Sequence, residues 1–285
     1  MGSCSDCASK SSCSSANADK GCSSKTNIMM KLMPKYGKIK NVIGVVSGKG
    51  GVGKSTVTGM IAISLREQGY KVGVLDADIT GPSMPRILGV QNEKSVMTPV
   101  DDNKNVKFEP VLTKSGIKVI SLNLVNESED APVIWRGPVI TGVLNQMYQQ
   151  TNWGELDYLL IDMPPGTGDV ALTIMQQYPL RELIVVSTPQ DMVSMIVKKL
   201  VNMADKFKIK VRGVVENMAY IECECGRKMK VFSKKSSEEC AEYFGLPLIA
   251  ELPINIELTE ALEEGRAEEY IADHPLYSSV FSALY

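Results

Sequence analysis

The sequence has no excess of either charge and no long hydrophobic run. Its 285 residues include 31 lysines and arginines against 33 acidic residues, a formal net charge of −2. This balance provides no general polycation for nucleic acid or an anionic membrane, so we expect neither as a partner. An apolar run of about 18 residues, which a transmembrane helix needs, is missing. The N-terminus also lacks the apolar stretch of a secretory signal, so we expect a cytoplasmic protein.

Cysteine, in contrast, occurs seven times. In a reducing compartment, cysteines are more often metal ligands or free thiols than structural disulfides. Four of them lie within residues 1–27, a stretch rich in Ser, Lys and Asn that contains almost nothing able to build a core. We therefore expect residues 1–27 to be a flexible, disordered, Cys-rich tail and residues 28–285 to form the folded domain.

Short apolar runs alternate with longer helical stretches through the rest of the chain. The runs are residues 42–46, 72–75, 119–122, 159–161, 183–186, 211–215 and 248–252. Most are continuous, which is typical of parallel strands buried on both faces. We predict a doubly wound α/β fold with a mainly parallel sheet and helices on both faces. Two insertions are expected, a turn-rich one at 90–116 and a Cys-containing one near 219–235.

One stretch matches the phosphate-loop pattern G-x-x-x-x-G-K-[ST], after an apolar run and before a helical one. It consists of Gly48, Lys49, Gly50, Gly51, Val52, Gly53, Lys54 and Ser55, and Thr56 follows directly. Glycines let backbone N–H groups converge on phosphate oxygens, and the helix N-terminus adds positive partial charge. Lys54 is expected to reach the β- and γ-phosphates of ATP, and Ser55 to ligate Mg²⁺. The alternative is a Gly-rich strand–helix turn without a ligand.

Acidic residues follow two of the predicted strands. Asp76 and Asp78 end one run and Asp162 ends another. Ligands in such sheets bind beyond the carboxyl ends of the strands, so Asp162 is a natural Mg²⁺ partner and Asp76 would assist Mg²⁺ or hold the loop. Each of these residues could instead be an ordinary turn or helix-capping residue.

The loop sequence GKGGVGKS resembles the deviant Walker A family, which includes MinD, ParA and nitrogenase iron protein. The resemblance implies a nucleotide-sandwich homodimer in which Lys49 reaches the partner's nucleotide, although a solvated loop lysine is the simpler alternative. Asp78 lies where the family places the carboxylate that positions the attacking water. Asn217 resembles the family's adenine-contacting Asn, or is an ordinary Asn at a strand end.

Further motifs narrow the resemblance to the Mrp/ApbC-type iron–sulfur cluster carrier ATPases. They are DADITGPSMPRILG, WRGP, DMPPGTGD, STPQD and VVENMAYIECECG, in the expected order. The resemblance implies an ATPase that binds a [4Fe–4S] cluster between two subunits and transfers it to apo iron–sulfur proteins. Each subunit would supply two thiolates, here Cys223 and Cys225. Hydrolysis should be slow, because no arginine finger is evident; Arg136 is either an interface residue or part of a loop salt bridge.

This cysteine pair has one spacer residue, whereas the family has two. On an extended segment residues i and i+2 point the same way, so both sulfurs can still face one cluster. A zinc half-site and a reactive dithiol are the alternatives. Cys240 lies on a predicted helix over 236–244, where we expect a buried core thiol.

The tail cysteines are Cys4, Cys7, Cys13 and Cys22. Their spacing resembles part of the N-terminal cluster motif of Nbp-type carriers, with the fourth cysteine downstream instead of upstream. A tail [4Fe–4S] cluster, a zinc knuckle and an unliganded tail all fit. Two other functions compete with the carrier: a MinD/ParA-type positioning ATPase acting on membrane or DNA, and a nitrogenase-iron-protein-like electron donor.

Overall fold

The computed structural model describes residues 31–79, 81–100, 106–125, 137–189, 191–223, 225–233, 236–281 and 284. The predicted tail, its four cysteines and Arg136 lie outside these residues, so the expectations for them stay predictions. The chain from Lys31 onward forms one compact unit.

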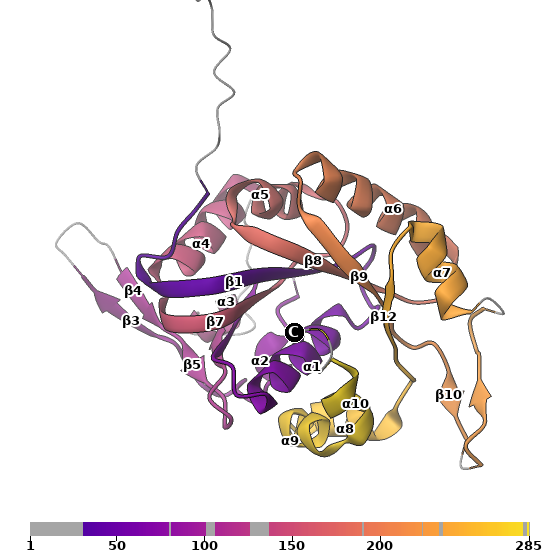
Figure 1. The fold of residues 1–285 in the computed structure, drawn as a ribbon. Helices are drawn as coiled ribbons and strands as arrows, with labels where there is room; N and C mark the ends of the chain where they lie inside the picture. Colours follow the sequence, from indigo (N-terminus) through magenta and orange to yellow (C-terminus); the bar gives the residue numbers. More distant parts are fainter. Residues whose placement is uncertain are drawn as a thin grey trace, which may run out of the picture. The chain divides into compact units, whose positions relative to one another are not determined.

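A central sheet of eight strands organises this unit (Figure 1). Its order is β12 (Leu248–Glu251), β9 (Lys210–Glu216), β8 (Leu180–Ser187), β1 (Tyr36–Ser47), β7 (Asn152–Asp162), β2 (Val72–Asp76), β6 (Lys118–Ile120) and β5 (Val111–Leu112). Every neighbouring pair is parallel except β5 with β6. The predicted mainly parallel sheet is confirmed.

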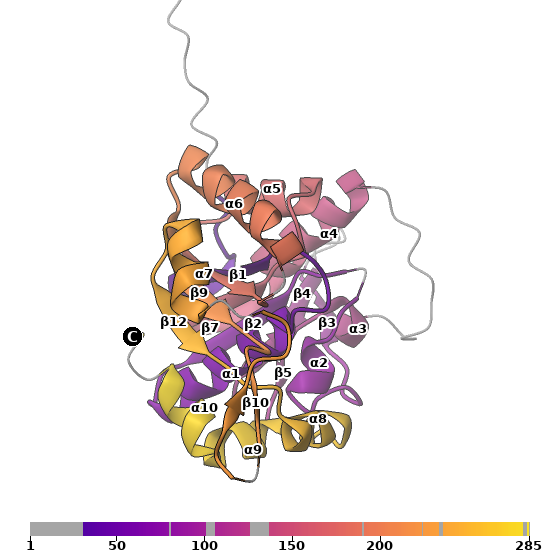
Figure 2. The same ribbon diagram turned by 90° about the vertical axis from the view of Figure 1, so that its right-hand side faces the viewer.

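Helices cover both faces of the sheet, as Figures 1 and 2 show. One face carries α1 (Lys54–Glu67), α2 (Met84–Ile87), α8 (Ile256–Glu263), α9 (Ala267–Asp273) and α10 (Pro275–Val280). The other carries α4 (Gly137–Gln150), α5 (Asp169–Gln177), α6 (Asp191–Lys206) and α7 (Ser237–Phe244). The short α3 (Leu122–Val125) follows β6.

The strands contribute side chains to two hydrophobic cores, one on each face of the sheet. In β1, Ile43 and Val45 belong to the core beneath α1, whereas Val42 and Val46 belong to the core beneath α4 to α7. Successive side chains of a strand point to opposite faces, so a strand covered on both sides must be apolar at every position. This is why the strands read as continuous apolar runs.

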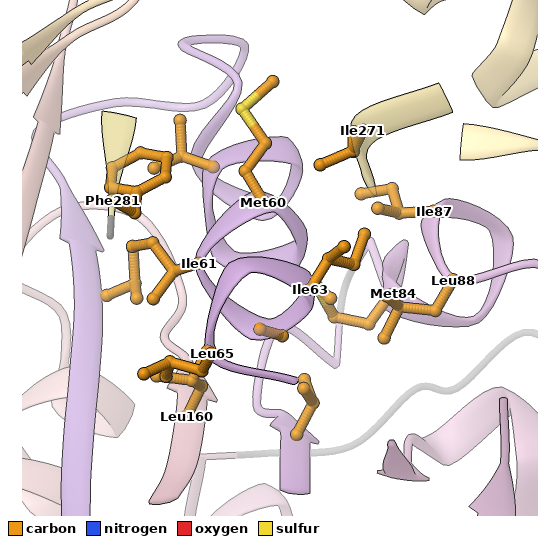
Figure 3. Packing of buried hydrophobic residues seen from close by; sticks show 14 of the residues in the cluster. Met60, Ile61, Ile63, Leu65, Met84, Ile87, Leu88, Leu160, Ile271 and Phe281 are labelled. Carbon is orange, nitrogen blue, oxygen red and sulfur yellow. The ribbon is translucent and has the colours of Figure 1, made fainter. Parts of the chain in front are cut away.

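Helix α1 is the centre of the first core (Figure 3). Ile61 and Leu65 lie toward Leu160 and Phe281, while Ile63 lies toward Met84 of α2. All six side chains are at most 1% exposed. Packing on all these sides fixes α1, and with it the loop from which the helix starts.

Both predicted insertions contain short antiparallel pairs. Within 90–116, β3 (Val96–Pro99) pairs with β4 (Val106–Glu109), so the described part of this stretch contains a strand pair that the sequence did not predict. Within 219–235, β10 (Ile221–Glu222) pairs with β11 (Lys228–Met229) in a hairpin. In the part of the chain that the structure describes, no helix is long and apolar enough to cross a membrane.

Candidate nucleotide and cysteine sites

The phosphate loop joins the carboxyl end of β1 to the N-terminus of α1. Gly51 and Gly53 adopt left-handed backbone conformations, with φ of 79° and 78°, which side chains disfavour. A Cβ atom on Gly53 would collide with Nδ2 of Asn217, whereas one on Gly50 or Gly51 would meet no atom within 4 Å. Gly53 is therefore packed against the protein, and the neighbouring glycines face open space.

That open space is a cavity of about 290 Å³. It is lined by Ser47, Lys49, Gly50, Gly51, Gly53, Lys54, Ser55, Thr56, Asp78, Gly81, Ser83, Ile87 and Pro165. The structure thus brings the predicted loop residues together with Asp78 from the segment after β2. Predicted residues outside the lining are Gly48, Val52, Asp76, Asp162 and Asn217, and the last four are buried.

Asp162 lies at the carboxyl end of β7 and has no exposed side-chain surface. Its Oδ2 is 2.7 Å from Lys54 Nζ and accepts a 2.6 Å hydrogen bond from Ser55 Oγ. Its Oδ1 accepts a 2.8 Å bond from Thr58 Oγ1. A serine hydroxyl beside a buried carboxylate is the hard oxygen donor set that Mg²⁺ prefers, so Ser55 and Asp162 fit this ion. The sequence analysis did not identify Thr58. It could have been found from its position, because it lies one helical turn after Lys54, and its hydroxyl also binds the Lys54 carbonyl.

Asp76 is a second buried carboxylate, and its contacts are those of a loop-holding residue. Its Oδ2 accepts the backbone N–H groups of Ser83 and Met84, at 3.0 and 3.1 Å, and its Oδ1 accepts that of Asp78 at 3.2 Å. Ser121 Oγ, which the sequence did not indicate, donates at 3.2 Å. Burial, and next the negative charge of Asp162, raise the pKa of Asp76 to about 7. Asp76 thus fixes the segment that presents Asp78.

Asn217 packs against the phosphate loop and binds its backbone. It follows β9, is 7% exposed, and donates from Nδ2 to the Val52 carbonyl at 3.0 Å. Its backbone N–H donates to the carbonyl of Ser187 at the end of β8. The loop after β7 also contacts this region, because the N–H of Gly166 donates to the Ser47 carbonyl at 2.8 Å. Neighbouring strands thus hold the phosphate loop from two sides.

Cys223 and Cys225 lie at the turn of the β10–β11 hairpin. The Cys223 carbonyl accepts the N–H of Gly226, and the Cys223 N–H donates to the Arg227 carbonyl. The two cysteines therefore do not lie on an extended segment, the case considered from the sequence: the chain reverses here, and Gly226 takes a φ of 77°. The turn itself brings the two sulfurs together, and they are joined in a disulfide with Cα atoms 5.3 Å apart.

Once the disulfide is reduced, the hairpin would offer a metal two thiolates, those of Cys223 and Cys225. Across the described residues, no group of three or more His, Cys, Asp or Glu side chains is placed to hold an ion. Cys240 lies on α7, which begins with a capping box between Ser236 and Glu239. Its thiol is half-exposed, so the expectation of a buried core thiol was wrong.

A family model described as a ParA-type, NUBPL iron-transfer P-loop NTPase matches residues 38–284. The chain belongs to this family. It is 68% identical, over the whole length of both chains, to an iron-sulfur cluster carrier protein of Clostridium perfringens. A protein of the same description from Methanocaldococcus jannaschii is 42% identical over 82% of this chain and 80% of its own.

Solved structures agree on the fold. A nucleotide-binding protein from Archaeoglobus fulgidus in complex with ADP is 42% identical and covers 85% of this chain and 92% of its own, with a TM-score of 0.72. The cell division ATPase MinD of Pyrococcus furiosus covers 85% and 96%, with a TM-score of 0.61, but is only 21% identical. The likeness to MinD therefore concerns the fold alone. The predicted family and P-loop NTPase fold are confirmed.

Proposed function

We propose that this chain is an ATP-hydrolysing carrier that binds a [4Fe–4S] cluster between two copies of itself and transfers it to apo iron–sulfur proteins. The observation that carries the proposal is the pair Cys223 and Cys225, joined in a disulfide that reduction would open to two thiols. The pair lies on a hairpin that begins four residues after Asn217, which binds the phosphate loop. The full-length likeness to a cluster carrier supports it.

The nucleotide half of the function follows from the cavity. Lys54 neutralises phosphate charge, the backbone of residues 48–55 donates N–H groups, and Ser55 with Asp162 would hold Mg²⁺. When bound, Mg²⁺ would neutralise charge on the β- and γ-phosphates. Asp78 lines the cavity and is the residue we assign to orienting the attacking water. We expect slow turnover, because none of the arginines that the structure describes lines this cavity.

The cluster is the cargo of the protein. Iron–sulfur clusters are held by thiolates, and a [4Fe–4S] cluster with full cysteine ligation takes four. One hairpin supplies two, so a two-fold axis between identical chains completes the set. The disulfide must first be reduced, because the thiolate is the ligand. Lys49, at the edge of the cavity, is the residue we expect to reach the second chain's nucleotide in the same dimer.

A matched pair of variants tests the cargo. Reduced protein is reconstituted anaerobically with ferrous iron and sulfide and mixed with an apo iron–sulfur protein. The expected result is that Cys223→Ser/Cys225→Ser loses iron uptake and transfer at this site, while Cys240→Ser, a half-exposed thiol on α7, behaves as the wild type. Equal iron and equal transfer in the double variant would overturn the proposal.

A further inference from the structure

A second cavity lies between α5 and α6, on the face of the sheet opposite α1. Its volume is about 450 Å³, and Figures 1 and 2 show the two helices side by side. Leu172 of α5, Met203 of α6 and Phe207, directly after α6, give this cavity apolar walls and are all partly exposed. The cavity, called here the α5–α6 groove, therefore offers an apolar side chain of a partner a place to be buried.

The rim of the groove is positively charged. Lys199, Asn202 and Lys206 line it, are exposed, and lie at helical spacing on one face of α6. None of the described lining residues is acidic. Within the described part of the chain, neither lysine forms an ion pair. The groove thus fits an apolar side chain that is flanked by carboxylates.

The loop that ends at α5 lines both this groove and the phosphate cavity. Thr167 lines the groove, and Pro165, two residues earlier, lines the phosphate cavity. Gly166, between them, donates its backbone N–H to the Ser47 carbonyl at 2.8 Å, and Ser47 also lines the phosphate cavity. A nucleotide that shifts Pro165 would shift Thr167 too, because a single residue joins them.

We propose that the α5–α6 groove is the docking site for an acidic segment with an apolar centre on the apo iron–sulfur protein, and that nucleotide changes its affinity through residues 165–167. The inference rests on the proposed function, which requires an acceptor. Opposite charge attracts the segment, and burial of its apolar side chain against Leu172, Met203 and Phe207 holds it. None of the described lining residues belongs to the β10–β11 hairpin, so docking and cluster release use different residues.

A peptide fits this surface better than a nucleic acid does. The described cations of the rim are lysines, which lack the guanidinium fork that binds phosphate at two points. They flank an apolar floor, whereas a nucleic acid backbone needs cations along its track. The chain's net charge of −2 provides no general attraction for a polyanion either.

A pair of charge reversals tests the docking. Lys199→Glu/Lys206→Glu is compared with Lys35→Glu/Lys38→Glu, which makes the same charge change at two exposed lysines near the start of β1. Each full-length protein is loaded anaerobically, and the initial rate of cluster transfer is measured against the concentration of an apo [4Fe–4S] ferredoxin. We expect the groove variant to need roughly tenfold more acceptor for half-maximal transfer, with ATP affinity and iron uptake unchanged. The β1 variant should match the wild type.

A fluorescein-labelled peptide with four glutamates around one phenylalanine probes the groove without a cluster. By fluorescence anisotropy, it should bind the unloaded wild type more tightly than the same peptide with alanine at its centre. It should lose affinity for the groove variant and keep it for the β1 variant. Equal acceptor requirements or equal peptide affinities in the two variants would overturn the docking. Stronger competition by duplex DNA than by unlabelled peptide would assign the rim to nucleic acid and also overturn it.

The same peptide tests the link to nucleotide. Its dissociation constant should differ roughly fivefold or more between protein saturated with ADP and protein saturated with a non-hydrolysable ATP analogue. Bound peptide should change the ratio of the two nucleotide affinities by the same factor. Equal peptide affinities in the two nucleotide states would overturn the role of residues 165–167. If no iron uptake by the wild type depends on Cys223 and Cys225, the proposed function fails, whereas the peptide measurements still decide whether the groove binds an acidic segment.

Discussion

The phosphate cavity and the cysteine hairpin differ in how completely one chain builds them. At the cavity, the buried carboxylate of Asp162 has partners from Lys54, Ser55 and Thr58, all within the same chain. At the hairpin, Cys223 and Cys225 are joined in a disulfide at a turn, where Cys223 is partly exposed and Cys225 exposed. A site assembled from neighbouring strands is preorganised before its ligand arrives. On the proposed function, a second copy would complete the half-site on the hairpin, and the cluster would leave when that copy departs.

The largest effect is expected when the positive charge of Lys54, which pairs with Asp162 inside the cavity's own chain, is removed. Lys54→Ala leaves Asp162 buried without its cation, which costs about 3–5 kcal/mol of stability. It also removes the phosphate contact, so ATP affinity should fall by roughly 100-fold or more. Calorimetric titration measures the affinity. The double variant Lys54→Ala/Asp162→Asn should recover stability without recovering ATP binding, and near-wild-type affinity in a folded Lys54→Ala protein would contradict this role.

Lys49 tests whether the cavity, too, uses a second chain. Lys49→Ala should still bind ATP but hydrolyse it roughly 100-fold more slowly, the usual loss for one stabilising donor. Mixing this variant with Lys54→Ala should restore part of the turnover, since the second protein offers Lys49 to the first protein's nucleotide. Steady-state phosphate release checks both points. No gain on mixing would place the role of Lys49 within its own chain.

Asn217 connects the two regions, and its loss should have a smaller effect. Asn217→Ala leaves the Val52 carbonyl without its donor, a cost of about 1–3 kcal/mol. We expect ATP affinity to fall roughly tenfold while iron uptake at the hairpin persists. Asn152→Ala, which removes a side-chain bond to Glu109 away from the cavity, is the control. Equal affinities in the two variants would show that Asn217 does not support the loop.

The smallest effect concerns the pH dependence of stability. Because the pKa of Asp76 is raised in the folded chain, the unfolded chain releases this proton first. The contribution to stability is therefore present below about pH 4 and is lost as the pH rises to about 7. Thermal melting of the apoprotein across this range should show a shallower decline in Asp76→Asn. Parallel curves for the two proteins would contradict the raised pKa.

Local patterns predicted one region better than the other. The phosphate loop is contiguous in sequence, and its strand and helix follow from apolar runs, so the residues from Gly48 to Thr56 were identifiable. Ser121 was not, because it reaches Asp76 from the position directly after β6, a strand that lies next to β2 in space but far from it along the chain. Thr58 was hidden among the apolar residues of α1.

At the hairpin, the sequence could not predict the backbone conformation. A pair of cysteines with one spacer fits an extended strand and a tight turn equally well, and the φ of Gly226 together with the pairing of β10 and β11 decides between them. The half-exposure of Cys240 likewise depends on how α7 sits against its neighbours. Neither feature is determined by the residues nearest in sequence.

The most direct test of the account is native mass spectrometry of the reduced, anaerobically reconstituted protein. We predict a dimer carrying one [4Fe–4S] cluster, which disappears in Cys223→Ser/Cys225→Ser and persists in Cys240→Ser. A complete cluster on a single chain, held through Cys223 and Cys225, would contradict it.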